Sequence, residues 1–351
     1  MGKIAMIGLL CLGQQVSDGQ SIKTRMVAQE LSRALGPENL LTVDTFGWKK
    51  HPHQLLLGCF RAVREAEHIL FLTDAGGIRV FPWLLLGLGK LYGKKIHYSV
   101  IGGWLVNFLG KHPFLTACLR RLDTVFVETA ALERGLRGLG FQNMHLLPNF
   151  KDLTCLREEE LVTGEGEPYG FCTLSRVMEE KGIADAVKAI QTINRESGRT
   201  VATLDIYGSV DPAQREWFRK LSSEFPEGVR YCGVVPYDRT VEVLKGYHAL
   251  LFPTHYATEG IPGTVIDAYA AGVPVIAARW EGFRDIVEHG RTGLGYPMLD
   301  QKGLTGRIRE AVQFPEGITA MKKYCLKKAE DYLPSTVMDT LLKEMGVTQH
   351  A

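Results

Sequence analysis

Residues 254–276 read THYATEGIPGTVIDAYAAGVPVI and decide how the second half of the chain is organised. The apolar run at residues 249–252 lies just upstream and predicts a buried strand. Residues 265–271 predict a compact apolar helix, and Gly272 follows at the position where a left-handed C-terminal cap is expected. Residues 273–277 predict the next strand, so the stretch indicates a strand, turn, helix, strand unit.

This unit brings polar groups to the start of its helix. The amides of Gly263, Thr264 and Val265 are expected to be unpaired there, where an anionic ligand would be held. Glu259 precedes the helix and Asp267 lies about one turn inside it, so the two carboxylates can flank such a ligand. The alternative is an ordinary βαβ crossover with one capping acid and one surface acid, and the spacing alone leaves both open.

Residues 259–277, EGIPGTVIDAYAAGVPVIA, resemble the signature of family 4 retaining glycosyltransferases. In that signature a Glu, seven residues and a second acid accompany a small-residue helix and a G-x-P-V-I run. Asp267 stands where the family usually has Glu, which shortens the reach by one methylene. A second part of the resemblance is an Arg, five residues on a Lys, and then Gly, which Arg176 and Lys181 match.

A third part of the resemblance follows the central stretch. Residues 280–294, WEGFRDIVEHGRTGL, look like the family's G-x-x-[DE]-I-V-x-x-G-x-T-G tail. The match places Arg284 and Asp285 on a short helix and makes Gly290 and Gly293 turns.

The resemblance implies the fold and the reaction. The implied fold is α/β, with two Rossmann-like doubly wound domains facing each other across a cleft, the GT-B architecture. The implied reaction moves a sugar from a nucleotide-diphosphate sugar to an acceptor hydroxyl with retention of configuration.

The resemblance also implies roles for individual residues. Arg176 and Lys181 would stabilise the departing diphosphate, assisted by the helix amides after Pro262. Glu259 would bind hydroxyls of the donor sugar, and Asp267 would bind those of the ribose.

The two cations need separate consideration. Arg176 and Lys181 lie at a strand exit, where they can clamp a diphosphate and neutralise charge as a magnesium ion does elsewhere. No metal or other cofactor is then required. The alternative is that they are loop cations that pair with Glu179 or Glu180.

The first half of the chain predicts a doubly wound domain. Strands that alternate with helices indicate a mostly parallel sheet with helices on both faces. The fingerprint G-x-G-x-x-G is absent, which disfavours a dinucleotide oxidoreductase. The predicted strands of this half are 4–10, 40–46, 68–73, 96–101, 124–128 and 144–147.

Two glycines are candidate donor contacts. Similar enzymes place a glycine-rich loop against the donor phosphates before the first helix, where Gly19 is the best match and Ser21 a plausible cap. Gly208 follows the strand predicted at residues 203–207, at a tight turn where a nucleotide can approach the backbone. The alternative for both glycines is ordinary turn chemistry.

A histidine found in similar enzymes is missing. They carry a His-Gly pair at the end of the fourth strand, where this chain reads Ile101-Gly102-Gly103. His97 lies four residues upstream on the predicted strand. A lone strand histidine is more often structural, so no catalytic role is assigned to His97.

The length of 351 residues suits two α/β domains. Residues 151–168 are polar, acidic and contain glycine, which is typical of a linker. We expect an acceptor-binding domain at 1–150 and a nucleotide-sugar-binding domain at 169–325. Residues 326–351 predict a terminal helix that packs back toward the first domain and is broken or kinked at Pro334.

The cysteines and the N-terminus bear on location. Seven cysteines without a C-x-x-C pair favour reduced thiols in a cytosolic compartment over a disulfide frame or a zinc site. The start MGKIAMIGLLCLG superficially resembles a signal peptide, but Gln14 and Gln15 replace small cleavage-site residues, so a buried strand is the simpler explanation. No apolar stretch reaches the roughly 20 residues that cross a bilayer. We expect a cytoplasmic protein, with the inner face of the cell membrane as its site of work.

Charge differs between the halves. Residues 1–150 hold 17 Lys and Arg against 10 Asp and Glu, and residues 151–351 hold 24 against 29. The segment 79–121 has no acid and interleaves cations with aromatic and aliphatic residues, which suits contact with an anionic bilayer and a lipid-linked acceptor. The alternative is that the apolar residues are core and the cations ordinary surface, and nucleic acid is a more distant possibility that we do not expect. The cations are Arg79, Lys90, Lys94, Lys95, Lys111, Arg120 and Arg121.

Other functions fit the same pattern. A nucleotide-sugar epimerase or a phosphorylase would use the same two-domain plan. A catalytically inactive, membrane-associated binding module is a further alternative, although the cation pair and the acid pair argue against it. The sugar, base and acceptor are open, and synthesis of a cell-surface polysaccharide or glycolipid is the expected role.

Overall fold

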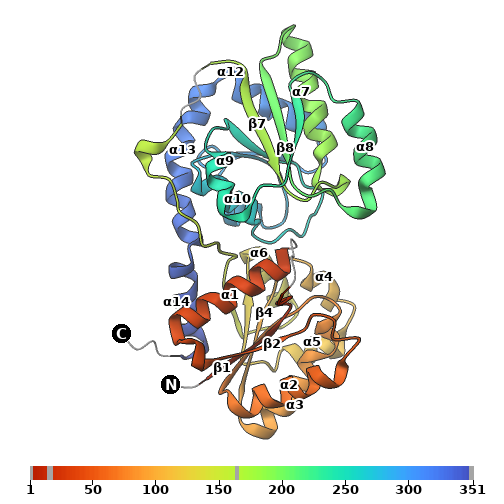
Figure 1. Ribbon diagram of the computed structural model, residues 1–351, viewed down its shortest axis with the longest axis vertical. Helices are drawn as coiled ribbons and strands as arrows, with labels where there is room; N and C mark the ends of the chain where they lie inside the picture. Colours follow the sequence, from red (N-terminus) through yellow and green to blue (C-terminus); the bar gives the residue numbers. More distant parts are fainter. Residues whose placement is uncertain (1–2, 14–18, 163–165, 348–351) are drawn as a thin grey trace. The chain divides into compact units, whose positions relative to one another are not determined.

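The computed structural model describes residues 3–13, 19–162 and 166–347. The chain divides into two compact units (Figure 1). Unit 1 comprises Met1–Asp152 and Pro334–Ala351, and unit 2 comprises Leu153–Leu333. Each unit contains a six-stranded parallel sheet with helices on both faces, which confirms the predicted α/β fold class.

Unit 1 has the strand order β2-β1-β3-β4-β5-β6, so the order reverses between β1 and β3. One face of its sheet packs against α2, α3 and α5, and the other packs against α1 and α14. The strands are β1 (Ile4–Gly8), β2 (Leu40–Asp44), β3 (His68–Leu72), β4 (Lys95–Ser99), β5 (Thr124–Val127) and β6 (Met144–Leu146). The helices are α1 (Gly19–Leu35), α2 (Pro52–Glu65), α3 (Phe81–Tyr92), α4 (Leu105–Leu109), α5 (Pro113–Leu119), α6 (Ala130–Gly138) and α14 (Pro334–Met345).

Unit 2 has the strand order β12-β11-β10-β7-β8-β9, which reverses between β7 and β10. Helices α7, α8 and α12 cover one face, and α9, α10 and α11 cover the other. The strands are β7 (Tyr169–Leu174), β8 (Ala202–Tyr207), β9 (Val229–Gly233), β10 (Ala249–Phe252), β11 (Val275–Arg279) and β12 (Gly293–Pro297). The helices are α7 (Ile183–Ser197), α8 (Arg215–Ser223), α9 (Thr240–Leu244), α10 (Gly263–Ala270), α11 (Phe283–Ile286), α12 (Gln301–Gln313) and α13 (Pro315–Ala329).

Helix α10 ends as its sequence predicts. Gly272 has a φ of 64°, the left-handed conformation. Its N–H donates to the carbonyl of Tyr269 at 2.9 Å, and the N–H of Val273 donates to the carbonyl of Ala268 at 2.7 Å. This pair of bonds is a Schellman motif, which satisfies carbonyls at the helix end and turns the chain into β11.

Two local expectations are wrong. Helix α1 begins at Gly19, so Ser21 lies inside its first turn and is not the cap. Gly293 is the first residue of β12 and not a turn. A Cβ there would lie 2.2 Å from the carbonyl oxygen of Val275 in β11, so the close approach of the two strands requires glycine. The strand at residues 293–297 was therefore missed.

The unit boundaries differ from the expected domain boundaries. The division falls between Asp152 and Leu153, and Leu153 and Cys155 pack against the core of unit 2. Residues 326–333 also belong to unit 2, and α14 starts at Pro334.

Every helix in the described part of the chain is too short or too polar to cross a bilayer.

Candidate functional site

The predicted site lies at the carboxyl edge of the sheet of unit 2. Arg176 and Lys181 follow β7, and residues 254–264 follow β10. Strands β7 and β10 are neighbours, and the strand order reverses between them. In doubly wound sheets, ligands bind outside the carboxyl ends of the strands at this reversal.

The loops after β7 and β10 are held against each other. Gly182 has a φ of 69°, and a Cβ there would lie 1.9 Å from the carbonyl oxygen of Pro253. The N–H of His255 also donates to the carbonyl of Glu180 at 2.8 Å. Only glycine permits this approach, which explains the Lys-Gly pair at 181–182 in structural terms.

Lys181 and Glu259 form an ion pair between these loops. Lys181 Nζ contacts Glu259 Oε1, and the two side chains are 19% and 16% exposed. Thr254 Oγ1 donates to the same carboxylate oxygen at 2.8 Å. Lys181 Nζ also lies 4.8 Å from the centre of the Tyr256 ring, a cation–π distance. The pair is therefore partly desolvated and fixed in place.

Neither cation makes the local pairing considered from sequence. Lys181 pairs with Glu259, and Arg176 Nη1 lies 3.5 Å from Asp211 Oδ2, in the loop after β8. The Arg176 side chain is 45% exposed, so the second pair is weak. One such contact leaves other guanidinium N–H donors for a ligand.

The start of α10 has unused polar groups. Within the described residues, the N–H groups of Gly263 and Thr264 donate to no backbone acceptor. The expectation is wrong for Val265, whose N–H donates to the carbonyl of Pro262 at 3.0 Å. Thr264 Oγ1 is buried and has no hydrogen-bond partner in the described part of the chain. A buried polar atom without a partner is uncommon and fits a site that a ligand completes.

Asp267 is buried in α10 and faces α9. It is 3% exposed, and Thr240 Oγ1 donates to its Oδ1 at 2.9 Å. The carboxylate is thus held in one orientation. Its role toward a ribose stays a prediction.

The two candidate glycines have different settings. Gly208 has a φ of 134°, and a Cβ there would lie 1.7 Å from the carbonyl oxygen of Ser175. Packing of the β8 exit against the β7 exit therefore requires glycine whether or not a nucleotide binds. Gly19 begins α1 in unit 1, is exposed, and would meet nothing within 4 Å as alanine. Most of the loop before it, residues 14–18, lies outside the described residues.

His97 is a core residue of β4. It is 1% exposed, its Nε2 lies 3.1 Å from Nδ1 of His68, and the two rings stack at 5.3 Å. Burial, with the neighbouring His68 and Lys95, lowers the pKa of His97 to about 3. The imidazole is therefore neutral near pH 7, which agrees with the structural role expected from the sequence.

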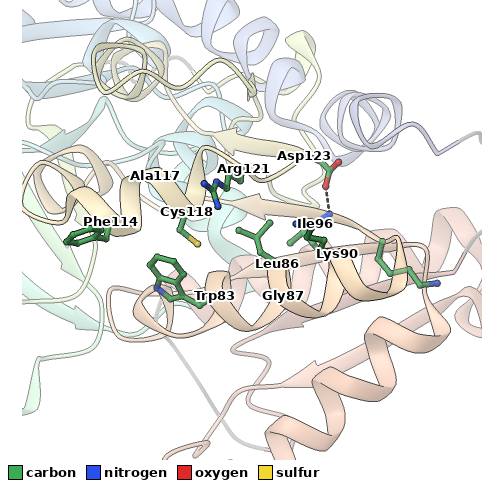
Figure 2. Close-up of a pocket in the computed structure, with 11 residues that line it drawn as sticks. Trp83, Leu86, Gly87, Lys90, Ile96, Phe114, Ala117, Cys118, Arg121 and Asp123 are labelled. Atoms are coloured by element: carbon green, nitrogen blue, oxygen red, sulfur yellow. Dashed lines mark hydrogen bonds between the residues drawn. The ribbon is translucent and has the colours of Figure 1, made fainter.

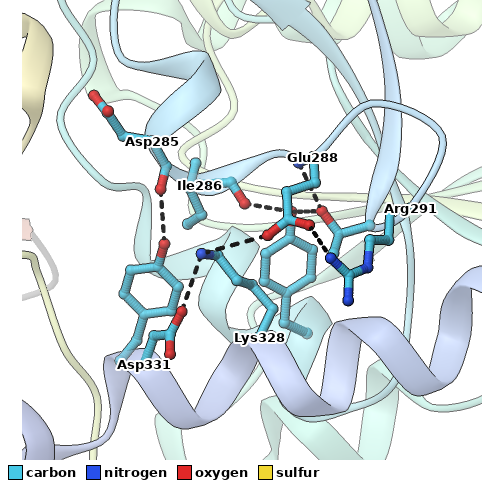
Figure 3. Close-up of polar contacts among 9 residues, drawn as sticks. Asp285, Ile286, Glu288, Arg291, Lys328 and Asp331 are labelled. Atoms are coloured by element: carbon cyan, nitrogen blue, oxygen red, sulfur yellow. Dashed lines mark hydrogen bonds and ion pairs between the residues drawn. The ribbon is translucent and has the colours of Figure 1, made fainter.

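The tail at residues 280–294 is tied to neighbouring helices (Figure 3). Tyr269 of α10 donates to the carbonyl of Ile286 at 3.0 Å, and Tyr332 donates to the carbonyl of Asp285 at 3.1 Å. Lys328 Nζ lies 3.7 Å from Glu288 Oε1. As expected, Arg284 and Asp285 lie on the short helix α11, and Gly290 has a φ of 79°. These contacts indicate that the tail holds α10 and α13 together.

Four further site residues were not assigned from sequence. Thr254 and Tyr256 contact the Lys181–Glu259 pair, and Thr240 holds Asp267. His255 Nε2 lies 2.7 Å from Asp185 Oδ2 on α7. Thr254, His255 and Tyr256 lie in the loop between β10 and Glu259. Their position in this loop could have identified them as candidate site residues from the sequence. Thr240 has no such signal, because it lies 27 positions from Asp267.

Among the described residues, no group of three or more His, Cys, Asp or Glu is placed to hold a metal ion.

The segment that carries these residues belongs to a known family. Residues 168–313 match the family model described as glycosyl transferases group 1, and this segment is a group 1 glycosyltransferase domain. The group 1 resemblance is thereby confirmed. Glycogen synthase of Mycobacterium tuberculosis (strain H37Rv) is 25% identical over 258 residues, which are 68% of this chain and 60% of that protein.

Solved structures share the fold of the whole chain. Anabaena Alr3699/HepE, in a complex with UDP, superposes with a TM-score of 0.78 at 12% identity, covering 98% of this chain and 99% of that one. Sucrose-phosphate synthase from Thermosynechococcus elongatus has a TM-score of 0.77 at 17% identity, covering 99% of each chain. The two doubly wound units are those of the GT-B fold, as predicted.

Proposed function

We propose that the protein is a retaining glycosyltransferase that moves a sugar from a nucleotide-diphosphate sugar to an acceptor hydroxyl. The observation that carries the proposal is the meeting of Lys181 and Glu259, 78 positions apart, where the order of strands reverses in unit 2. The group 1 domain contains both residues.

The diphosphate would bind to fixed positive groups. Lys181 and Arg176 supply charge from the β7 side, and the N–H groups of Gly263 and Thr264 supply donors from the start of α10. A diphosphate oxygen would take the place of Glu259 beside Lys181. These groups would stabilise the negative charge that grows on the departing nucleoside diphosphate. We therefore propose that transfer needs no divalent metal.

The carboxylates would position the donor. Once Lys181 binds phosphate, Glu259 can accept hydrogen bonds from hydroxyls of the sugar while Thr254 keeps its orientation. Asp267, held by Thr240, would accept from the ribose hydroxyls. Both carboxylates are engaged by the protein, so we assign neither of them the role of a nucleophile.

We propose that the acceptor attacks from the face that the diphosphate leaves. The bond between the anomeric carbon and the phosphate oxygen breaks, and a bond to the acceptor oxygen forms on the same side. A phosphate oxygen of the leaving group takes the acceptor proton. This route retains configuration without the close carboxylate pair of retaining glycosidases.

Replacement of Lys181 tests the proposal. UDP, GDP and dTDP are first compared as ligands by thermal stabilisation, starting with UDP because Anabaena Alr3699/HepE is found with it. Lys181→Ala should then lower turnover of the matching nucleotide sugar by about two to three orders of magnitude, the scale of losing one transition-state donor.

Lys188→Ala is the matched control, because Lys188 is an exposed cation on α7. It should leave turnover unchanged, as should EDTA. Near-normal turnover by Lys181→Ala would remove Lys181 from the mechanism. Conversion of the nucleotide sugar without any acceptor would identify an epimerase instead.

We also propose the setting of the reaction. A cytoplasmic enzyme acting on a lipid-linked acceptor would serve synthesis of a cell-surface polysaccharide or glycolipid. The cation-rich segment 79–121 supports this setting.

A further inference from the structure

Three helices of unit 1 form a face with many exposed apolar side chains. Helices α2, α3 and α5 pack on the same side of the sheet, with α3 in contact with both of the others (Figure 1). The exposed fraction reaches 83% for Phe114 and 72% for Leu91. We call this surface the α2–α3–α5 face, and its large exposed apolar side chains are Leu56, Leu57, Phe60, Trp83, Leu91, Tyr92 and Phe114.

These side chains are additional to the ones that build the core. Helix α2 already buries Leu55, Cys59 and Val63 against the sheet. Its exposed Phe60 lies edge-on to Tyr92 of α3, with ring centres 5.9 Å apart, so the outer apolar side chains continue from one helix to the next. A helix that is apolar both toward the core and toward solvent indicates that its outer surface contacts another molecule or a membrane.

A pocket opens between α3 and α5. Its volume is about 870 Å³, and Trp83, Leu86 and Phe114 supply much of its apolar lining. Figure 2 shows Trp83 and Leu86 on α3 and Cys118 on α5 directed into the space between the helices. The volume lies in the range of pockets that take small ligands.

Positive charge surrounds the apolar lining. Lys90, Lys94 and Arg121 also line the pocket. The lining includes one acid, Asp123, whose Oδ2 accepts the N–H of Ile96 at 2.7 Å. The complementary ligand has an anionic head and an apolar body.

Helix α2 extends the positive face beyond the segment 79–121. It adds Arg64, whereas Arg61 is paired with the acid Glu65 at 2.8 Å and adds no net charge. No acid occurs between Asp74 and Asp123. Interleaved cations and apolar side chains over several helices match an anionic lipid surface, which offers phosphates and an apolar interior together.

We propose that the α2–α3–α5 face docks on a bilayer of anionic phospholipid and that the pocket between α3 and α5 takes one lipid. The apolar side chains enter the interface, and Lys90, Lys94 and Arg121 bind the headgroup phosphates. Docking is separate from sugar transfer, because no residue of the face belongs to the site of unit 2.

The position of the pocket fits this role. Ile96 is the second residue of β4, and Asp123 directly precedes β5, so the pocket lies toward the amino ends of these strands. Ligands of doubly wound sheets bind at the carboxyl ends. The lipid site is therefore distinct from the edge of unit 1 at which an acceptor is expected.

Vesicle flotation of the full chain without nucleotide sugar tests the proposal. The protein should float with vesicles of equal parts phosphatidylglycerol and phosphatidylcholine and stay behind with phosphatidylcholine alone. Lys90→Ala with Lys94→Ala should lower the partition coefficient by about 30-fold, the expected loss for two cations near an anionic surface. Trp83→Ser with Phe114→Ser should also lower it.

The controls are matched in charge and in apolar character. Lys188→Ala with Lys220→Ala removes two exposed cations from unit 2, and Phe314→Ser removes an exposed aromatic side chain there. Both should float like the unaltered protein. Melting temperatures of all variants should agree, since the replaced side chains pack mainly at the surface.

Several outcomes would overturn the proposal. One is failure of the unaltered protein to float, and another is equal flotation of the Lys90 and Lys94 variant and its control. Self-association without lipid that Trp83→Ser with Phe114→Ser abolishes would assign the face to a second copy. Stabilisation by UDP, measured on the same samples, reports on the donor site separately.

Discussion

At the residue scale, the site depends on a contact that local sequence does not reveal. The nearest acids to Lys181 along the chain are Glu179 and Glu180, yet its partner is Glu259 on the loop after β10. Gly182 makes this partner reachable, because its missing side chain lets the two loops touch. The motif singled out Lys181 and Glu259 as candidates, whereas their pairing follows from the neighbouring positions of β7 and β10.

Thr264 gives a residue-scale prediction. Its buried hydroxyl makes no hydrogen bond within the described residues, so Thr264→Val should leave the melting temperature unchanged or raise it. If the hydroxyl binds the donor, the same change should weaken UDP binding by about tenfold, the scale of one hydrogen bond. Calorimetric titration with UDP and a thermal melt measure the two effects.

Thr240→Val is the comparison for that experiment. Thr240 Oγ1 donates to the buried Asp267, so its loss leaves a carboxylate oxygen without that donor. This variant should have a lower melting temperature by several degrees. Unchanged UDP affinity in Thr264→Val would show that the Thr264 hydroxyl does not contact the nucleotide.

At the scale of elements, a central strand of unit 2 was predicted with its observed bounds. Strand β10 covers the expected residues 249–252, because it is a short apolar run with a clear break at Pro253. Strand β12 was missed because its sequence GLGYP begins with Gly and ends with Pro, as turns do. Its glycine is needed for close approach to β11, which is visible only in the sheet.

The segment 79–121 shows why burial could not be read from the sequence. Phe81 and Leu85 are core residues, whereas Trp83, between them, is 51% exposed. All three belong to one helix, and only its packing against the sheet separates them. Both alternatives offered by the sequence, core and surface, therefore apply to different residues of the same helix.

Helix α13 contains a buried lysine with a testable pH dependence. Lys322 is 1% exposed, and burial lowers its pKa from 10.5 to about 8. Between these values the unfolded chain binds more protons than the folded one, so stability should rise as pH rises from about 8 to about 10.5. Below pH 8 the full cost of the buried charge, about 3 kcal/mol, is present.

Lys322→Met should therefore raise the melting temperature at pH 7 and remove this rise in alkaline solution. The gain in the free energy of unfolding is reduced by about 1 kcal/mol, because the variant loses the hydrogen bond that Lys322 Nζ donates to the carbonyl of Tyr247 at 3.1 Å. Thermal melts from pH 7 to pH 10 measure the change in stability. Lys323→Met, at the exposed neighbouring position, is the control and should behave like the unaltered protein. Loss of stability at pH 7 in Lys322→Met would contradict the argument.

At the scale of the whole molecule, unit 1 is built from two separate parts of the chain. Helix α14 buries apolar side chains against α1 and the sheet, and His145 Nδ1 lies 2.9 Å from Glu344 Oε2. Sequence predicted a terminal helix that packs back toward the first domain, and in the structure α14 belongs to unit 1. The buried residues of α14 are Val337, Met338, Leu341, Leu342 and Met345.

Removal of residues 334–351 should therefore unfold unit 1. Five buried apolar side chains together contribute an amount comparable to the whole stability of a typical domain, about 5–15 kcal/mol. Limited proteolysis should cut residues 3–152 rapidly in the shortened chain and spare residues 169–330. Deletion of residues 348–351 alone is the control, and protease resistance of unit 1 after the longer deletion would show that α14 is dispensable.

The split composition of unit 1 affects the order in which the protein can fold during translation. Residues 153–333 leave the ribosome before residues 334–345 and hold all the strands of their own sheet. Unit 2 can thus fold while the core of unit 1 is still incomplete, because α14 shares a core cluster with Ile4, Met6 and Leu70. Unit 1 is complete only after residues 334–345 have left the ribosome, so a nascent chain needs protection of that apolar surface until then.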